Sequence, residues 1–369
     1  EILGRLKAGT YRPREDFEAG TVEGLYLNVA NGVLDLETRD LYANDPEYLF
    51  TSHLPVAYDP DADGDRIESF LDDITRREPD KLTMLEMVGN CFLPNYDYES
   101  FLVLFGEGSN GKSTFYSVVR QLLGRDSVSS MTLQTLSDNR FAASNLLGKL
   151  ANIGEDLPAK KITDVGTLKD LTGGGETWVE EKGQQGFDME NRAKLMFAAN
   201  RPPVLGEKSE AVKRRLLPVR LPYQFVPDPD PDDPEQKEAV KEGLLDELTA
   251  DEQLSAFLNM ALDGLDRLRE TGDFSLPESN DERLEYYEQF SDPIKEFAIN
   301  CLENDDGKRI TKDTVYNAYT NFCRQNDYES SVSSVFWRDL RRTVLNVSVV
   351  RPAAEDGERR VQYLDDATF

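Results

Sequence analysis

The chain has 369 residues, more than one ordinary hydrophobic core accommodates, so two to four domains are expected. Its 70 Asp and Glu residues outnumber 42 Lys and Arg residues, and the formal net charge is −28. The acidic residues are spread along the chain, which predicts a solvated surface suited to high salt and a halophilic source. This charge argues against a nucleic acid partner, except in a narrow and locally basic channel.

The rest of the composition excludes other classes of site. Three isolated cysteines and a single histidine, His53, cannot build a zinc site or a Cys/His nucleophile, and they fit a reducing compartment. No apolar run approaches the roughly 18 residues of a membrane span, and no signal-peptide core is found. We therefore expect a cytoplasmic protein without membrane contact. Because the chain starts at Glu1 rather than Met, we also expect a longer parent protein.

The N-terminal part predicts small packing elements. Alternating apolar residues on both sides of Asn31-Gly32 predict a hairpin over residues 25–36. A loop rich in Asp and Pro follows. Helices with one apolar face are then predicted over residues 67–74 and 80–92.

The next stretch carries the most specific motif in the chain. An apolar run over residues 101–105 is typical of a buried strand, and residues 106–114 fit the phosphate-loop pattern G-x-x-x-x-G-K-[ST]. A helix is predicted over residues 114–123, with Gly124 as its C-cap. Strand, loop and helix thus occur in the order of a nucleotide triphosphate site. An accidental surface loop is the alternative, and the flanking strand and helix disfavour it.

The glycine loop suits phosphate chemistry, because glycines let backbone N–H groups point at phosphates and the helix N-terminus adds partial positive charge. Lys112 is expected to reach the β- and γ-phosphates of ATP, and Ser113 is expected to ligate Mg²⁺. The expected nucleotide-binding residues are Gly106, Glu107, Gly108, Ser109, Asn110, Gly111, Lys112, Ser113 and Thr114.

Polar residues follow two later strands. A short strand predicted over residues 149–154 ends at Glu155 and Asp156. Facing phosphates, one carboxylate of such a pair can hold Mg²⁺ and the other can orient or deprotonate the attacking water. Which of the two binds the metal stays open, and an exposed acidic pair is the alternative in so acidic a chain. A strand over residues 194–199 ends at Asn200, whose amide is expected near the γ-phosphate.

A basic cluster, Lys213, Arg214 and Arg215, precedes a strand predicted over residues 216–221. The cluster either forms salt bridges or offers an arginine finger, Arg215 or Arg214, to the ATP of a neighbouring subunit. Strands that alternate with helices around a phosphate loop predict a parallel α/β sheet.

The C-terminal third predicts a linker, a long helix and a small DNA-binding module. Residues 227–234 are acidic and proline-rich, which is typical of a linker, and residues 251–270 are strongly amphipathic. From about residue 291, three helices and a hairpin over residues 347–364 are typical of a winged helix. Its expected DNA contacts are Arg338, Arg341 and Arg342 on the third helix and Arg359-Arg360 on the wing. An exposed polar helix face explains them equally well.

The order of these motifs resembles that of a known family. The phosphate loop, the acidic strand end, Leu-Lys-Asp-Leu-Thr-Gly-Gly at 168–174, Phe-Ala-Ala-Asn-Arg-Pro-Pro at 197–203 and the Arg-Arg pair are similar to superfamily 3 helicases. The similarity is strongest to the primase-helicase proteins of poxviruses, phages and archaeal mobile elements, and it covers about residues 20–225. It implies an AAA+-like ring, usually hexameric, that hydrolyses ATP between subunits and unwinds DNA by translocating on one strand.

The resemblance also implies roles by matched position. Lys112 and Ser113 take the phosphate and Mg²⁺ roles, Glu155 and Asp156 the acidic roles, Asn200 the sensor role, and Arg215, with Arg214 as the other candidate, the finger role. In this family a hairpin before the sensor strand, expected here over residues 178–188, carries basic residues into the central pore. Its match is Lys182. The chain departs from the family there, because Glu180 and Glu181 precede Lys182 and Trp178 stands where an Arg is common.

Together these inferences predict an α/β protein with an AAA+-like P-loop NTPase core. The expected domains are an N-terminal helicase-associated α+β region over 1–95, the ATPase core over 96–225, an acidic linker and helical segment over 226–286, and a winged-helix-like domain over 287–369. We expect an ATP- and Mg²⁺-dependent replicative DNA helicase, a hexamer on single-stranded or forked DNA, with a primase domain or protein as a further partner. An ATP-driven initiator or remodelling ATPase without processive unwinding is the main alternative, followed by a DNA-binding assembly module.

Overall fold

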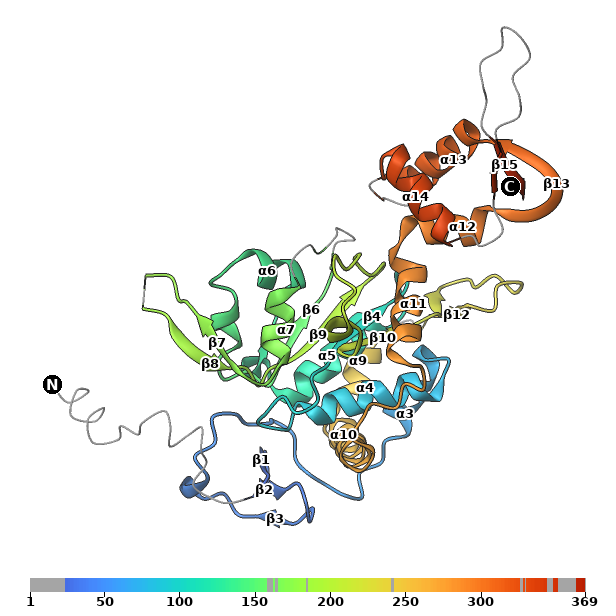
Figure 1. The fold of residues 1–369 in the computed structure, drawn as a ribbon. Helices are drawn as coiled ribbons and strands as arrows, with labels where there is room; N and C mark the ends of the chain where they lie inside the picture. Colours follow the sequence, from blue (N-terminus) through green and yellow to red (C-terminus); the bar gives the residue numbers. More distant parts are fainter. Residues whose placement is uncertain are drawn as a thin grey trace, which may run out of the picture.

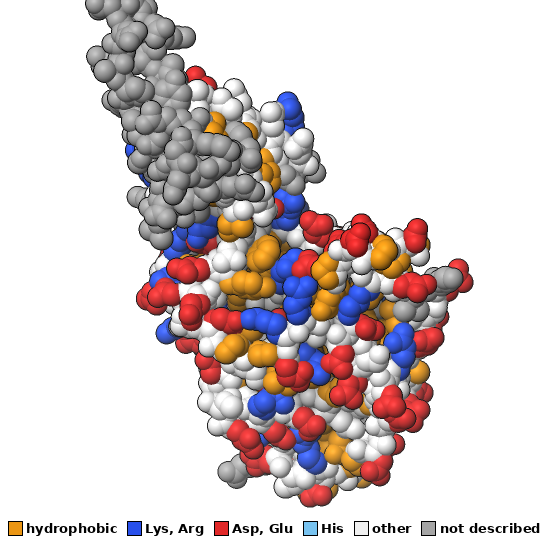
Figure 2. All heavy atoms as spheres, turned by 90° about the vertical axis from the view of Figure 1, so that its right-hand side faces the viewer, with side chains coloured by type: hydrophobic (Ala, Val, Ile, Leu, Met, Phe, Trp, Pro, Cys, Tyr) orange, Lys and Arg blue, Asp and Glu red, His pale blue; other side chains and the backbone are white. Residues whose placement is uncertain are grey.

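The computed structural model describes residues 24–157, 162, 165–183, 185–239, 242–325, 328, 330–343, 348–350 and 363–368. A central sheet has helices on both faces, and a smaller C-terminal unit lies at one end (Figure 1). Among the described helices, none is long and apolar enough to cross a bilayer. Acidic side chains are spread over the surface between patches of other types, as Figure 2 shows for one face.

The central sheet contains five parallel strands in the order β10-β4-β9-β6-β5. They are β10 (Leu216–Arg220), β4 (Phe101–Phe105), β9 (Lys194–Ala199), β6 (Ala151–Gly154) and β5 (Val128–Ser129). Every residue of β4, β6 and β9 is buried, as expected for parallel strands covered on both faces. The predicted parallel α/β sheet is confirmed. The edge strand β5 was not predicted, because two residues give no periodic signal.

The N-terminal hairpin is confirmed and gains a third strand. Strand β1 (Tyr26–Val29) pairs with β2 (Gly32–Asp35), and β2 pairs with β3 (Leu41–Tyr42), all antiparallel. A short 3-10 helix, η1 (Pro46–Tyr48), follows. Buried side chains of β1 and β2 join the main hydrophobic cluster below the sheet.

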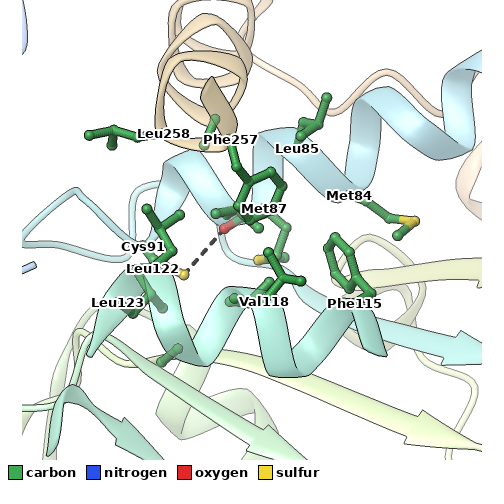
Figure 3. Close-up of a cluster of buried hydrophobic side chains, with 14 of the residues drawn as sticks. Met84, Leu85, Met87, Cys91, Phe115, Val118, Leu122, Leu123, Phe257 and Leu258 are labelled. Carbon is green, nitrogen blue, oxygen red and sulfur yellow. Dashed lines mark hydrogen bonds between the residues drawn. The ribbon is translucent and has the colours of Figure 1, made fainter. Parts of the chain in front are cut away.

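One face of the sheet is covered by helices from separated parts of the chain. They are α3 (Asp65–Ile74) and α4 (Glu78–Asn90) before β4, α5 (Lys112–Leu123) after the phosphate loop, and α9 (Leu244–Leu248) and α10 (Asp251–Thr271) beyond the predicted linker. Their buried side chains form one hydrophobic cluster. Figure 3 shows side chains of α4, α5 and α10 meeting there, among them Met87, Phe115 and Phe257.

Helices α4 and α10 cross at two glycines. A Cβ on Gly89 would lie 2.2 Å from a backbone oxygen of α10, and a Cβ on Gly264 would lie 2.8 Å from the carbonyl carbon of Leu85. Neither position has room for a side chain, so the two helices touch through their backbones. Arg267 of α10 also donates to the fully buried Glu86 of α4 at 2.8 Å. Helix α10 is therefore packed on the helix that precedes the phosphate loop.

The opposite face of the sheet carries a second hydrophobic cluster. It is covered by α6 (Leu133–Asp138) and α7 (Gly166–Thr172). Three further short helices occur in this part of the sequence: η2 (Arg125–Ser127), η3 (Ala143–Leu146) and α8 (Glu210–Lys213). The predicted hairpin is confirmed as β7 (Glu176–Val179) paired antiparallel with β8 (Phe187–Glu190). Val179 and Met189 anchor this hairpin in the cluster.

Two elements lie between the sheet and the C-terminal unit. Strand β11 (Gln224–Val226) pairs in parallel with β12 (Gln236–Glu238), and the acidic, proline-rich residues 227–234 connect them. Helix α11 (Asn280–Ser291) was not predicted. It begins with a capping box between Ser279 and Glu282 and buries Tyr287 in the second cluster.

The C-terminal unit contains α12 (Pro293–Cys301), β13 (Glu303–Thr311), α13 (Lys312–Gln325), α14 (Ser333–Thr343), β14 (Ser348–Val350) and β15 (Tyr363–Thr368). Its three predicted helices are confirmed, and they share a third cluster with the rings of Phe297, Tyr319 and Phe336 in contact. The predicted two-stranded hairpin was incomplete, because β15 pairs with β13 as well as β14. Strand β13 was missed because its polar sequence shows no apolar alternation.

Candidate active site

The phosphate loop connects β4 to α5 and requires its glycines. Gly111 has a φ of +89°, and a Cβ there would lie 2.5 Å from the side chain of Ile74. Gly106 has a φ of +149°, and a Cβ there would lie 2.3 Å from the carbonyl oxygen of Leu221. The loop is therefore held against α3 and the end of β10 in a conformation that only glycine adopts without strain.

A cavity of about 170 Å³ lies over this loop at the carboxyl ends of β4, β6 and β9. It is lined by Gly108 to Thr114, Glu155, Asp156, Ala198, Ala199 and Asn200. The structure thus brings Lys112, the acidic pair and Asn200 to one cavity, although they are separated by up to 88 positions in the sequence. The chemical role of each residue remains a prediction.

Lys112 is 7% exposed and is held by oxygens of its own loop. Its Nζ donates to the carbonyl oxygen of Gly106 at 2.7 Å and to Asn110 Oδ1 at 2.8 Å. Burial lowers the pKa of Lys112 to about 8, and the charge of Asp156 opposes this shift. The ammonium group of Lys112 is thus hydrogen-bonded to loop oxygens, and a phosphate chain would have to replace them in order to bind it.

The two carboxylates differ in their surroundings. Glu155 Oε1 accepts from Arg120 Nη1 at 2.5 Å, and Arg120 Nη2 donates to the carbonyl oxygen of Ile153 at 3.1 Å. Asp156 is exposed and has a φ of +54°, a left-handed conformation that is uncommon outside glycine and recurs at functional sites. No motif marks Arg120, which lies 35 residues before Glu155 within an amphipathic helix.

The oxygen ligands of the cavity fit Mg²⁺. The Ser113 hydroxyl and the carboxylates of Glu155 and Asp156 line one cavity, and hard oxygen ligands with room for water are what Mg²⁺ prefers. Within the described residues, no cluster of three or more His, Cys, Asp or Glu residues forms an all-protein metal cage. A metal shared with phosphates therefore suits this donor set better than a resident structural metal.

The predicted finger residues lie at the other end of the sheet. Arg215 precedes β10 and is 5% exposed. Its Nε donates to Thr172 Oγ1 at 3.0 Å, its Nη1 donates to Ala211 O at 2.8 Å, and its Nη2 pairs with Glu99. The guanidinium of Arg215 therefore already has partners within its own subunit, which argues against Arg215 as the finger residue. The side chain of Arg214 is 54% exposed and pairs with Glu99 at 2.5 Å, so Arg214 is the better placed candidate.

The predicted DNA contacts are separated in space. Lys182 is exposed in the turn of the β7–β8 hairpin, and Glu180 of that hairpin pairs with Arg140 at 3.5 Å. Arg338 on α14 is exposed but forms two hydrogen bonds with Asp339, at 2.8 and 2.9 Å. Arg341 is exposed on the same helix. The side chain of Arg342 and the wing residues Arg359 and Arg360 lie outside the described residues.

A second cavity, of about 370 Å³, adjoins the first at the start of the phosphate loop. Its wall includes Gly106 and Glu107 of the loop, Asn200, residues after β10, and residues of α11 and α12. No sequence motif marks it, because its wall comes from five separated segments.

Three families match separate parts of the chain. Residues 19–76 match the D5 N terminal like family, and residues 289–352 match the Poxvirus D5 protein-like family. Residues 104–215, which contain the phosphate loop, match a family of unknown function, DUF5906. The resemblance to D5-type primase-helicase proteins is confirmed.

The known proteins that resemble this chain are distant relatives and much longer. The "Putative helicase" of Acanthamoeba polyphaga mimivirus is 26% identical over 214 residues, which are 54% of this chain and 22% of that protein. The "Putative primase" of African swine fever virus is 22% identical over 224 residues, which are 57% of this chain and 23% of that protein. The chain thus spans less than a quarter of these relatives. The A form apo structure of the NrS-1 C terminal region is 11% identical, with a TM-score of 0.46 over 85% of this chain and 77% of that chain.

Proposed function

We propose that this chain is the ATPase and motor part of a DNA replication protein. It acts as a superfamily 3 helicase that hydrolyses ATP with Mg²⁺, assembles as an AAA+-like ring and unwinds duplex DNA by moving on one strand. Relatives named helicase and primase support a place in replication. The D5 family matches on both sides of the phosphate loop support the same assignment.

The observation that carries the proposal is the phosphate cavity itself. Lys112, Ser113, two carboxylates and an amide converge there from three parallel strands and the loop. Phosphoryl transfer needs little more than positioning and charge stabilisation, so a cationic group, Mg²⁺ ligands and a residue that orients water are the required parts. Glu155 and Asn200 both line the cavity, which supports a role for them in orienting a water molecule against the γ-phosphate.

The position of the basic cluster supports a ring. Arg214 lies at the amino end of β10, whereas the phosphate loop follows the carboxyl end of the parallel neighbour β4. A residue at that edge cannot reach the cavity of its own subunit. It can serve only the site of another copy, where a guanidinium would stabilise charge that develops on the γ-phosphate.

The topology of the C-terminal unit supports a winged helix. Its elements follow the order α12, β13, α13, α14, β14, β15, and its sheet has the order β13-β15-β14. In such modules the helix before the hairpin enters a DNA groove, and here that helix is α14, which carries Arg338 and Arg341. We propose this unit as a second DNA contact beside Lys182.

Strand displacement measured together with ATP hydrolysis tests the function. Wild-type protein should unwind a forked duplex with ATP and Mg²⁺, and Lys112→Ala should lose both hydrolysis and unwinding. Lys182→Ala should keep DNA-independent hydrolysis and lose unwinding, with Lys149→Ala, at a distant site, as the matched control. Wild-type protein that hydrolyses ATP but never displaces a strand would favour the initiator or remodelling ATPase instead.

A further inference from the structure

The phosphate cavity is too small for a whole nucleotide. It measures about 170 Å³ and is lined by the phosphate loop from Gly108 onward. The adjoining cavity measures about 370 Å³, begins at Gly106 and Glu107, and shares Asn200 with the first. Pockets for small organic ligands run from roughly 300 to 1,000 Å³, so the second cavity has the size of such a pocket and the first does not.

The wall of the second cavity has groups that recognise a base and a ribose. It presents amide side chains, aromatic rings and carboxylates, among them Gln224, Gln289, Asn300, Tyr223, Phe290 and Glu235. Amides offer paired donors and acceptors to base edges, and a carboxylate accepts from sugar hydroxyls. Arg220 lies 5.0 Å from the ring centroid of Phe290 and donates to Glu235 at 2.9 Å. Arg201 also lines the cavity and is paired with Glu296. Because both arginines of the wall are already paired with carboxylates, the cavity does not call for a second anion.

We propose that this cavity holds the base and ribose of the nucleotide whose phosphates occupy the loop, and that the bound nucleoside fixes the C-terminal unit against the ATPase sheet. The inference rests on the proposed function and names what α12 adds to the site. Glu296, Ile299 and Asn300 of α12 line the cavity, whereas Ile294 and Phe297 on its other face pack in the cluster of the C-terminal unit. Ile299 is 61% exposed, and a nucleoside would cover this apolar side chain.

A second connection runs from the predicted sensor to the same unit. Arg201 follows Asn200 directly, and its Nη1 lies 3.7 Å from Glu296 Oε1. The guanidinium of Arg201 also lies 4.9 Å from the ring centroid of Tyr328, whose hydroxyl donates to Glu296. A shift of Asn200 at the γ-phosphate would therefore also move Arg201, which is ion-paired with Glu296 of α12. Nucleoside and phosphate would then act on the C-terminal unit through one helix, and by linkage the docked unit would favour nucleotide binding.

Calorimetry with two ligands separates the nucleoside site from the phosphate site. The probes are Mg²⁺–ATP and Mg²⁺–tripolyphosphate, and both are applied to wild type and to two variants. Asn300→Trp narrows the cavity from an exposed position in its wall. Asn317→Trp makes the same change at an exposed position on α13 that does not line the cavity. Asn300→Trp should weaken ATP binding about tenfold or more and change tripolyphosphate binding by less than about twofold. Asn317→Trp should change neither.

Hydrogen exchange then measures whether the bound nucleotide fixes the C-terminal unit against the ATPase sheet. ATP should slow exchange of the amides of α12 in wild type, and tripolyphosphate should not. Arg201→Ala should lose part of this protection even at ATP concentrations that saturate the variant. If ATP and tripolyphosphate bind wild type equally well and Asn300→Trp changes nothing, the nucleoside site is overturned while the phosphate site stands. If neither ligand binds wild type, the proposed ATPase function fails instead.

Discussion

Arg120 and Glu155 form an ion pair beside the phosphate cavity, with 2.5 Å between Arg120 Nη1 and Glu155 Oε1. Arg120 comes from α5 and Glu155 from the end of β6, so the pair joins the phosphate-loop helix to the sheet. It fixes one carboxylate and leaves Asp156 exposed beside it. From this difference we propose that Glu155 orients water and that Asp156 binds the metal.

Replacing Arg120 tests whether it positions Glu155. Arg120→Ala should lower kcat for ATP hydrolysis by about tenfold to a hundredfold and leave KM nearly unchanged, because the carboxylate loses its fixed orientation while the loop stays intact. Arg120→Lys should recover part of the rate. Arg125→Ala, an exposed arginine just beyond the same helix, is the control. An Arg120→Ala protein with an unchanged kcat would rule out this positioning role.

The pKa of Lys112 predicts how nucleotide binding depends on pH. Burial lowers this pKa to about 8. Since the ammonium form binds phosphate, affinity is complete below about pH 8 and falls as the proton is lost above it. ATP should bind about tenfold more weakly at pH 9 than at pH 7, as measured by calorimetry. Lys112→Arg keeps its charge throughout this range, so any residual binding by that variant should not show the decline.

The two arginines before β10 should differ in the effects of substitution. Arg214→Ala should bind ATP normally but lose hydrolysis in the assembled protein, because its exposed guanidinium is the better placed finger. Arg215→Ala should instead lower the free energy of unfolding by about 2 to 4 kcal/mol, since Thr172 and Ala211 lose the hydrogen bonds from Arg215 and Glu99 keeps only Arg214. Denaturant unfolding and steady-state hydrolysis of both variants separate the two effects. If the assembled Arg214→Ala protein hydrolyses ATP at the normal rate, Arg214 is not the arginine finger.

The crossing of α4 and α10 predicts a large effect from one methyl group. In Gly264→Ala the new Cβ meets the backbone of Leu85 and Glu86 at 2.8 to 2.9 Å. The helices must separate, and the free energy of unfolding should fall by about 1 to 3 kcal/mol in denaturant titrations. Gly175→Ala is the matched control, because its Cβ would meet nothing within 4 Å. Equal stability of the two variants would mean that the helices can shift at no cost.

The acidic surface predicts dependence on salt. At −28 the chain repels itself, and the screening length falls from roughly 10 Å at 0.1 M salt to roughly 3 Å at 1 M. The unfolding temperature should therefore rise between these concentrations of KCl. Sucrose adds no ions and serves as the control for general solute effects. An unfolding temperature that is the same at 0.1 M and at 1 M KCl would not support the halophilic hypothesis.

Local sequence predicted four strands of the sheet and the residues that meet in the cavity over the phosphate loop. Strand β4 is a continuous apolar run, and β6, β9 and β10 are mostly apolar. The polar residues that follow β4, β6 and β9 predict the site, because carboxyl ends of parallel strands meet at one edge. Lys112, Glu155, Asp156 and Asn200 could therefore be placed together before any coordinates.

The missed features depend on contacts between distant segments. Arg120 reads as a polar position on an amphipathic helix until Glu155 is folded against it. The second cavity draws its wall from five segments, and β13 exists because β15 pairs with a polar run that has no strand pattern of its own. Sequence alone also does not show which of two adjacent arginines is buried, so the choice between Arg215 and Arg214 as the finger stays a prediction.

The backbone contact between Gly89 and Gly264 also limits where this protein can be cut. The proline-rich stretch at 227–234 is the obvious place to trim the chain, yet a fragment that stops there would leave α4 uncovered and expose Leu85, Met87 and Phe115 to water. Such a fragment should precipitate or be digested. A soluble fragment should extend at least through Leu276, whose side chain is, among the described residues, the last along the sequence to join that hydrophobic cluster.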